Sequence, residues 1–198
     1  MKKRLSIISL AFLAVIWMGV LPAAAESPTA FVQGIMDKTM AIQNNPALDT
    51  QARTRAIHQI IEQNFDFPMM AKDTLGATYG QLSEGQRQQF NNTFDYLFAD
   101  SYTRMVLNFL KQQNIKYGQE RQESGGKARL DTTLVRANDI IPVTYLMHSA
   151  PRGWLLYDVA VDGVSILENY RDEFGRVIRT KGFDYLLQRM EEQRRATE

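Results

Sequence analysis

The residues of this chain that could do acid–base chemistry are one acid in an apolar run and the tyrosines near it. Asp158 stands inside "WLLYDVAV", residues 154–161, and Tyr157 directly precedes it. A carboxylate and a phenol that reach the same cavity can pass a proton to or from a substrate, and Tyr145 is a second phenol that could take part. One hypothesis is therefore a small, cone-shaped α+β enzyme that uses Asp158 and a tyrosine.

The other reactive residue types are too few for the common catalytic sites. The chain contains two histidines, His58 and His148, and no cysteine. A metal site would need several His, Asp or Glu at helical or strand spacing, and the sequence has no such cluster. It also has no Gly-rich phosphate loop and no nucleophile elbow. We therefore predict that the protein is not an enzyme and has no metal site and no cofactor.

Asp158 is better interpreted as a structural residue. A buried carboxylate needs partners, and the candidates are backbone N–H groups or a cation such as Arg171 or Lys181. If side chains alternate strictly along the strand, they divide into two sets that point to opposite faces of the sheet. One face carries Asp158 with Trp154, Leu156 and Ala160, and the other carries Leu155, Tyr157, Val159 and Val161.

Three more positions are expected to fix the backbone after this strand. Asp162-Gly163 is a tight-turn pair, so Gly163 is the second structural residue. Ser165 is expected to cap the next helix, with Glu168 three residues later as its capping-box partner. Gly182 is expected to separate the last two helices.

The first half of the chain has the pattern of four helices. Ser27, Asp49, Asp66 and Ser83 are the expected N-caps, and Ser83 opens a long helix that runs to about Leu110. Apolar residues recur every three or four positions along this helix, which indicates that one side faces a core. They are Phe90, Phe94, Leu97, Phe98, Tyr102, Met105, Val106, Phe109 and Leu110.

The second half changes to a period of two. Strands are expected at about 115–123, 128–135, 141–147 and 155–161, and helices at about 165–180 and 183–194. Sequential strands joined by short turns form an antiparallel meander. The predicted fold class is therefore α+β: a four-stranded antiparallel meander sheet curled around helices, with helices before and after it and an apolar cavity between sheet and helices.

The N-terminus has the layout of a secretory signal peptide over residues 1–25. Lys2 to Arg4 are basic, Leu5 to Leu21 are apolar, and Ala23 to Ala25 provide a small-residue cleavage site. The alternative, a retained membrane anchor, is disfavoured because the apolar run is barely long enough to span a bilayer. We expect cleavage near Ala25, one domain over residues 26–198, and a location in the periplasm if the source is bacterial.

The charge balance argues against a nucleic-acid partner. The chain has 23 Lys and Arg against 22 Asp and Glu, and removal of the signal peptide would leave 20 against 22. Nucleic-acid binding calls for a basic stripe or patch, which this balance does not provide.

The apolar residues suggest a groove, although an ordinary core would use the same residues. Seven of the nine methionines follow the signal peptide, and methionine adapts to variable apolar ligands. Periodicity does not distinguish a filled core from a cavity, so both interpretations stay open at this point.

Two stretches of the chain resemble the MlaC family, the periplasmic phospholipid-binding component of the Mla lipid-transport system, also described as a toluene-tolerance auxiliary component. The first is "WLLYDVAVDGVSILENYRDEFGRVIRTKGFDYLL", with Tyr157-Asp158, Gly163-Val164-Ser165 and Lys181-Gly182 at the family's positions. The second is "FDFPMMAKDTLGATYGQLSEGQRQQFNNTF". With the signal peptide and the length, the resemblance covers nearly the whole chain. A hopanoid-associated branch of the family has the same layout.

The resemblance implies a non-enzymatic lipid carrier. Family members hold phospholipid tails between sheet and helices and shuttle lipid between an outer-membrane lipoprotein complex and an inner-membrane ABC transporter with an MCE-domain subunit. The candidate lipid-binding wall, taken from the inward registers, is Phe94, Phe98, Met105, Val143, Tyr145, Met147, Val159, Val161 and Leu167. An envelope adaptor that binds only protein is a further alternative. The headgroup, the number of acyl chains, the direction of transport, the docking surfaces and the oligomeric state stay open.

Overall fold

The computed structural model of the chain describes residues 26–110, 114–136 and 139–197, so the predicted signal peptide lies outside the described residues. Within these ranges the helices and strands, in chain order, are α1 (Pro28–Gln43), α2 (Thr50–Asn64), α3 (Phe67–Leu75), α4 (Ala77–Gln81), α5 (Glu84–Phe109), β1 (Asn114–Glu123), β2 (Lys127–Arg136), β3 (Asp139–Ala150), β4 (Gly153–Val161), β5 (Val164–Ser165), α6 (Ile166–Lys181) and α7 (Phe183–Thr197). Across these ranges, no helix combines the length and the hydropathy needed to cross a membrane.

The predicted helix starts are confirmed by their caps. The side chains of Ser27, Asp49 and Asp66 each accept a hydrogen bond from a backbone N–H in the first turn that follows. Ser83 and Gln86 form both halves of a capping box at the start of α5. The short helix α4 was not predicted, and it follows Gly76, which has a φ of 53°. Helix caps are local signals, which explains why the sequence predicts most of the helix starts.

The sheet is an antiparallel meander with one strand more than predicted. Its strand order is β1-β2-β3-β4-β5, and β5 has only two residues. Asp162 and Gly163, with φ values of 52° and 78°, form the two-residue connection between β4 and β5. Positive φ at both positions is typical of the tight hairpin turn that the Asp-Gly pair predicts.

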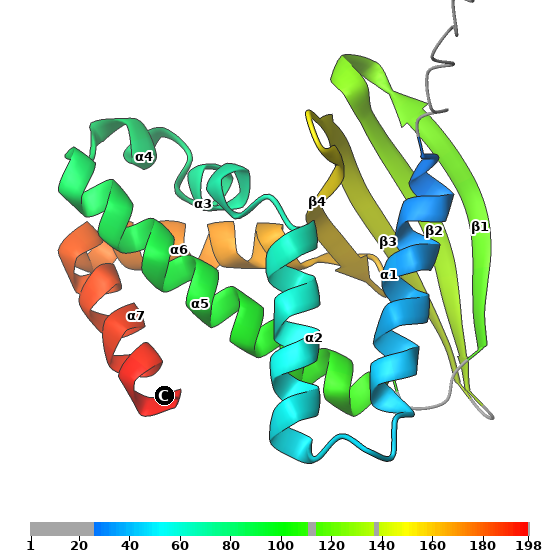
Figure 1. Ribbon diagram of the computed structural model, residues 1–198. Helices are drawn as coiled ribbons and strands as arrows, with labels where there is room; N and C mark the ends of the chain where they lie inside the picture. Colours follow the sequence, from blue (N-terminus) through cyan, green and yellow to red (C-terminus); the bar gives the residue numbers. More distant parts are fainter. Residues whose placement is uncertain (1–25, 111–113, 137–138, 198) are drawn as a thin grey trace, which may run out of the picture.

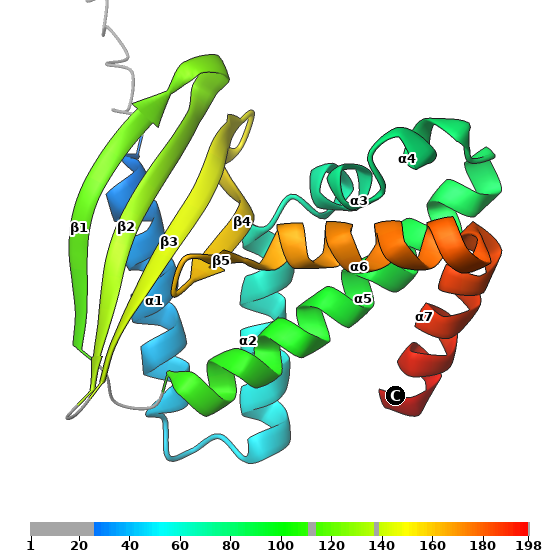
Figure 2. The same cartoon turned by 180° about the vertical axis from the view of Figure 1, so that it is seen from behind.

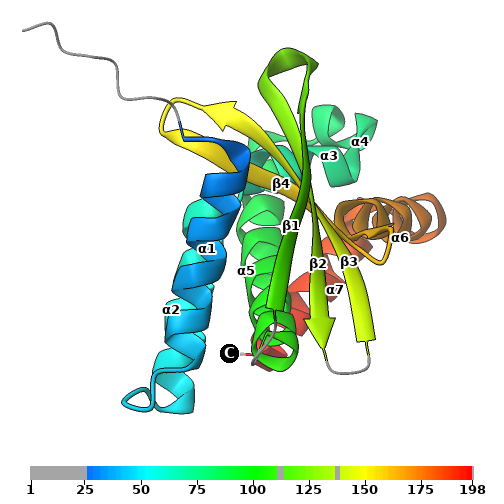
Figure 3. The same cartoon turned by 90° about the vertical axis from the view of Figure 1, so that its right-hand side faces the viewer.

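The helices divide into two groups around the long helix α5 (Figures 1 and 2). Helix α1 lies along one face of the sheet, with α2 beside it, and Figure 3 shows this pair edge-on next to the strands. Helices α3, α4, α6 and α7 gather around the first half of α5, and α3 and α6 also contact β4. We call this second group, with residues 84–98 of α5, the helical lobe.

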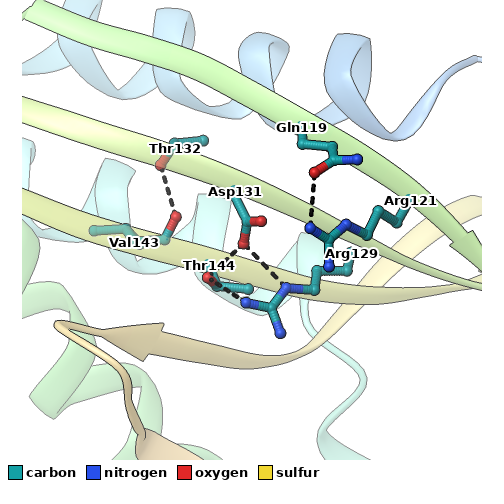
Figure 4. Close-up of polar contacts among 7 residues, drawn as sticks. All are labelled: Gln119, Arg121, Arg129, Asp131, Thr132, Val143 and Thr144. Atoms are coloured by element: carbon teal, nitrogen blue, oxygen red, sulfur yellow. Dashed lines mark hydrogen bonds and ion pairs between the residues drawn. The ribbon is translucent and has the colours of Figure 1, made fainter.

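The other face of the sheet is polar. Asp131 Oδ1 accepts hydrogen bonds from Arg129 Nε at 3.0 Å and from Thr144 Oγ1 at 2.8 Å, across two neighbouring strands (Figure 4). Arg129 and Asp131 are partly exposed. The apolar face of the sheet is the one covered by α1 and α5.

A column of four aromatic rings on α5 connects the helical lobe to the sheet. Phe90, Phe94, Phe98 and Tyr102 follow one another with ring centroids 5.8, 5.9 and 5.8 Å apart. The predicted apolar stripe thus faces the core over most of its length. Phe109 is an exception because it is 47% exposed.

Strand β4 contains a β-bulge that strict alternation did not predict. Leu146 pairs with Asp158, but Met147 pairs with Leu156, so Tyr157 has no partner opposite it. The extra residue reverses the faces on one side of the bulge. Leu156 and Val159 therefore both face the helices, and the prediction that Leu155 and Tyr157 share a face with Val159 and Val161 is wrong. Asp158 still points away from Val159.

A half-buried acid on α5, Asp95, lies near α2. Burial and the nearby Glu62 carboxylate, in that order, raise the pKa of Asp95 to about 6. Asp95 Oδ1 has no hydrogen-bond partner in the described part of the chain. His58 Nδ1 lies 3.5 Å from Glu62 Oε2 in the same cluster. Since the folded protein holds the Asp95 proton more tightly than the unfolded chain, this residue lowers stability as the pH rises from about 4 to about 6.

We predict that Asp95→Asn stabilises the protein at pH 7.5 and leaves it almost unchanged at pH 4.5. The expected gain is about 1 kcal/mol after allowing for partial solvent screening of the carboxylate. Urea unfolding of both proteins at the two pH values measures it, with Asp172→Asn on the exposed side of α6 as the control. Equal effects of Asp95→Asn at both pH values would contradict the prediction.

Candidate functional site

The sheet and the second half of α5 enclose a small apolar space of about 110 Å³, which we call the sheet-side cavity. The helix contributes Tyr102, Met105, Val106, Phe109 and Leu110, and the strands contribute Leu134, Ile141, Val143, Tyr145, Val159 and Val161. Among the described residues of this lining, the tyrosine hydroxyls are the only side-chain polar groups. The surface is therefore suited to hydrocarbon.

A narrow slit continues from this cavity towards a polar groove. The slit, of about 20 Å³, shares Tyr102 and Tyr145 with the cavity and runs between α1, α2 and the sheet. Its other end shares Ile35 and Phe65 with a groove of about 1020 Å³ beside the β3–β4 hairpin. Apolar and polar surfaces thus follow one another along one path, which is the pattern that an amphiphile requires.

The polar groove includes a side-chain contact between the helices and the sheet. His148 Nε2 lies 2.7 Å from Asp66 Oδ2, and the backbone N–H of Asp66 donates to the carbonyl oxygen of Leu156 at 2.8 Å. These contacts join the α2–α3 connection to β3 and β4. His148 is therefore half of a structural tie, and the described residues contain no cluster of His, Cys, Asp or Glu that could hold a metal ion.

The predicted wall residues fall into three groups. Met105, Val143, Tyr145, Val159 and Val161 line the sheet-side cavity together. Phe94 and Phe98 line a separate space in the helical lobe, between α5, α6 and α7, which we call the helical groove. Met147 and Leu167 are buried in the core and line neither space.

Sequence reasoning missed several residues that line the sheet-side cavity. Tyr102 and Val106 were placed on the inward stripe of α5 but were not chosen for the wall, although they lie one turn from each other and beside Met105. Leu134 and Ile141 were placed in the predicted strands but were also not chosen for the wall. An available signal was their strand pairing, since Leu134 is directly opposite Ile141 in the sheet.

The tyrosines of the cavity are neutral. Burial raises the pKa of Tyr145 far above that of a free phenol, and it also raises the pKa of Tyr102. The Tyr145 hydroxyl lies 3.8 Å from the sulfur of Met36, a weak acceptor. A phenol in this setting does not exchange protons readily, so neither tyrosine is suited to proton transfer.

Asp158 is bonded to three neutral donors. Its Oδ1 accepts from the backbone N–H of Val159 at 2.8 Å and from that of Leu167 at 3.0 Å. Its Oδ2 accepts from Ser165 Oγ at 2.5 Å. These contacts join the bulge of β4 to the start of α6 and use both oxygens, so the carboxylate does not reach the sheet-side cavity.

The alternative partners considered for Asp158, Arg171 and Lys181, are not the ones found. Arg171 Nε donates to the backbone carbonyl oxygen of Asp73 at 3.0 Å, which ties α6 to α3. Lys181 is the last residue of α6, fifteen positions from the helix start beside Asp158. Of the two kinds of partner considered, backbone N–H groups are the ones found, together with the hydroxyl of Ser165.

The remaining structural candidates lie at element boundaries. Ser165 Oγ accepts from the backbone N–H of Glu168 at 2.9 Å and is the N-cap of α6. Gly163 has a φ of 78° in the β4–β5 turn, and Gly182 has a φ of 89° between α6 and α7. Positive φ favours glycine at both turns.

The structure is an α+β protein with a small apolar cavity between sheet and helices. The MlaC protein family matches residues 33–192 of the chain. Because this match covers most of the chain, the protein belongs to the MlaC family.

Individual relatives agree with this assignment. The chain is 24% identical over 123 residues to the intermembrane phospholipid transport system binding protein MlaC of Haemophilus influenzae, covering 60% of this chain and 57% of that protein. It is 22% identical over 170 residues to the toluene tolerance protein ttg2D of Pseudomonas putida, covering 83% of this chain and 79% of that one. The chain thus spans little more than half the length of the first relative.

The fold has a solved counterpart. The phospholipid-binding protein from Ralstonia solanacearum, solved in complex with a phospholipid, superposes with a TM-score of 0.74 at 24% sequence identity. The superposition covers 88% of this chain and 98% of that chain. The α+β architecture is therefore shared over nearly its full extent.

We predict that Asp158→Ala destabilises the protein by about 3 kcal/mol, because it leaves two backbone N–H groups and one hydroxyl without an acceptor in a buried site. For a chain of this size the melting temperature should fall by about 6–12 °C, as measured by circular dichroism. Asp172→Ala, an exposed substitution on α6, is the control and should change little. A melting temperature unchanged by Asp158→Ala would show that the carboxylate is not an anchor.

Proposed function

We propose that this protein is a non-catalytic carrier that holds the acyl chains of a phospholipid between its sheet and its helices. The observation that carries the proposal is the sheet-side cavity, whose wall consists of apolar side chains and neutral tyrosines. Membership of the MlaC family and the phospholipid bound by the Ralstonia protein support the choice of ligand class.

The cavity must widen to hold a lipid. Its volume of about 110 Å³ is below the roughly 300–1,000 Å³ of ordinary ligand pockets. The wall proposed to move is the α1–α2 pair, since a slit of about 20 Å³ lies between this pair, α5 and the sheet. Outward movement of α1 and α2 would join slit and cavity into one space.

Polar contacts hold α1 at its two ends. The backbone N–H and the Oγ1 of Thr29 donate to Glu120 Oε2 at 3.0 and 2.6 Å. At the other end Gln43 Nε2 donates to the carbonyl oxygen of Leu110 at 3.0 Å. Between these ties the helix faces the slit with apolar side chains such as Ile35 and Met36. Outward movement of α1 would therefore have to release these ties.

A carrier is needed because lipid does not cross water unaided. Each methylene exposed to water costs about 0.8 kcal/mol, so one chain of about 15 methylenes costs roughly 12 kcal/mol. A protein cavity of apolar side chains removes most of this cost while the lipid is in transit.

We propose further that the protein works in the periplasm after removal of residues 1–25. There it would exchange lipid between an outer-membrane lipoprotein complex and an inner-membrane ABC transporter with an MCE-domain subunit. The names of the curated relatives, which refer to intermembrane phospholipid transport and to toluene tolerance, support this assignment.

The direct test is mass spectrometry of organic extracts from the purified protein. We expect phospholipid at close to stoichiometric amounts, because a widened cavity without hydrocarbon would expose its apolar wall to water. An extract with no more lipid than that of an unrelated exported protein would refute the carrier.

We predict that Val161→Glu reduces the co-purified lipid several-fold, because it puts a charge into the wall of the sheet-side cavity. The matched control is Ala160→Glu, the neighbouring residue on the opposite face of β4. Quantitative lipid mass spectrometry, with circular dichroism to confirm folding, measures the difference. Equal lipid loss in the two variants would place the ligand elsewhere.

A further inference from the structure

Helices α1 and α2 form a helical hairpin, residues 28–64, with a short connection at its closed end (Figures 1 and 3). Arg53 on α2 holds this closed end together. Its Nη2 donates to the carbonyl oxygen of Leu48 at 2.9 Å and to that of Asn45 at 3.1 Å. Its Nε donates to the carbonyl oxygen of Ile42, in the last turn of α1, at 3.4 Å. The two helices are therefore joined at this end and can move as one unit.

At the open end of this hairpin, the start of α1 is tied to the sheet. Thr29 Oγ1 and the Thr29 backbone N–H donate to Glu120 Oε2 on β1 at 2.6 and 3.0 Å. These hydrogen bonds lower the pKa of Glu120, so its carboxylate is ionised at neutral pH. Just before α1, the indole N–H of Trp154 on β4 donates to the carbonyl oxygen of Glu26 at 2.7 Å. Hydrogen bonds to a charged acceptor are about twice as strong as neutral ones, so this end of α1 is held firmly.

The end of α2 is tied to the sheet beside it. Phe65, directly after α2, forms a parallel bridge with Leu156 of β4. The backbone N–H of Asp66 donates to the carbonyl oxygen of Leu156 at 2.8 Å, and its Oδ2 lies 2.7 Å from His148 Nε2 on β3. The open end of the hairpin is thus tied to three strands, β1, β3 and β4.

At the closed end, Gln43, the last residue of α1, is bonded to the end of α5. Its Nε2 donates to the carbonyl oxygens of Leu110 at 3.0 Å, Val106 at 3.3 Å and Leu107 at 3.4 Å. The amide has two N–H groups for these three acceptors, so the bonds are shared, and they are neutral. Val106 and Leu110 line both the slit and the sheet-side cavity. Gln43 therefore joins α1 to α5 at the place where the two spaces meet.

We propose that the α1–α2 hairpin is a flap that rotates about its open end, and that the hydrogen bonds of Gln43 are the latch that keeps it closed and limits the rate of lipid exchange. Outward movement of the whole hairpin would release every tie to the sheet. Rotation keeps those ties and releases the Gln43 bonds together with the apolar contacts between α2 and α5. The inference rests on the proposed function, because it concerns how the same space admits a lipid.

The first test replaces the latch. Gln43→Glu puts a carboxylate against three carbonyl oxygens at the negative end of the α5 dipole, so it should open the flap. Transfer of a phosphatidylethanolamine with a fluorescent acyl chain, from the loaded protein to phosphatidylcholine vesicles, should become roughly three- to tenfold faster, the range of about one lost hydrogen bond. Gln43→Lys keeps a donor and should retain most of the wild-type rate. Gln59→Glu, on the exposed side of α2, is the matched control and should not change it.

Three more variants separate a latch from a general loss of stability. Gln43→Leu removes the donor without adding a charge, should act in the same direction as Gln43→Glu, and guards against a folding defect in that variant. Ser83→Ala removes the capping box at the opposite end of α5, so it should lower the melting temperature without faster transfer. Thr29→Val weakens the tie at the open end and should accelerate transfer less than Gln43→Glu, because the flap rotates about this end.

Hydrogen–deuterium exchange of the purified protein measures the flap without reference to a ligand. Gln43→Glu should speed the exchange of backbone amides at the end of α1, residues 36–43, several-fold and leave β2 and β3 unchanged. This result together with an extract free of phospholipid would refute the carrier and leave the flap standing.

Two results would overturn the flap. One is unchanged amide exchange at the end of α1 and unchanged lipid transfer in both Gln43→Glu and Gln43→Leu. The other is equal acceleration of transfer by Gln43→Glu and by Ser83→Ala or Thr29→Val, because it would show that any loosening of the fold releases the lipid. Neither result would affect the carrier proposal, which depends on the co-purified phospholipid.

Discussion

The carboxylate of Asp158 is the contact on which the arrangement of sheet and helical lobe depends. It bonds the backbone on the far side of the β4 bulge to the first turn of α6. The bulge lets Leu156 face the helices on one side of it while Val159 and Val161 face the cavity on the other. The start of α6 in turn fixes the direction in which this helix carries Tyr170 to α5. One buried acid therefore positions both apolar spaces, although it lines neither.

Most of the fold could be predicted from local patterns. Caps such as Ser83 and turns such as Asp162-Gly163 act within a few residues, so the sequence reveals them directly. The β4 bulge could not be predicted, because an unpaired residue in a strand is visible only from the register of the neighbouring strand. Phe109 was placed on the buried stripe because the helical period assigns a side but does not show where the partner surface ends.

Part of the candidate site could be predicted, because local periodicity shows which side chains share one face of a strand. Val143, Tyr145, Val159 and Val161 share inward registers of neighbouring strands, so the pattern groups them correctly around the sheet-side cavity. Phe98 lies on the same stripe of α5 but eight residues before Val106, about 12 Å along the axis. Periodicity identifies the inward side of a helix. It does not show that the helical lobe covers one half of that side and the sheet covers the other half.

The ties of α1 also have a consequence for how the chain folds. Thr29 and Glu120 are 91 positions apart, and Asp66 and His148 are 82 apart, whereas each strand pairs with the next strand in the chain. Contacts between distant positions form slowly because closing a long loop costs conformational entropy. We therefore expect the meander to form first and the N-terminal helices to close over it last. The wall that we propose to move for a ligand is then also the last to assemble, so loading and the final folding step would involve the same motion.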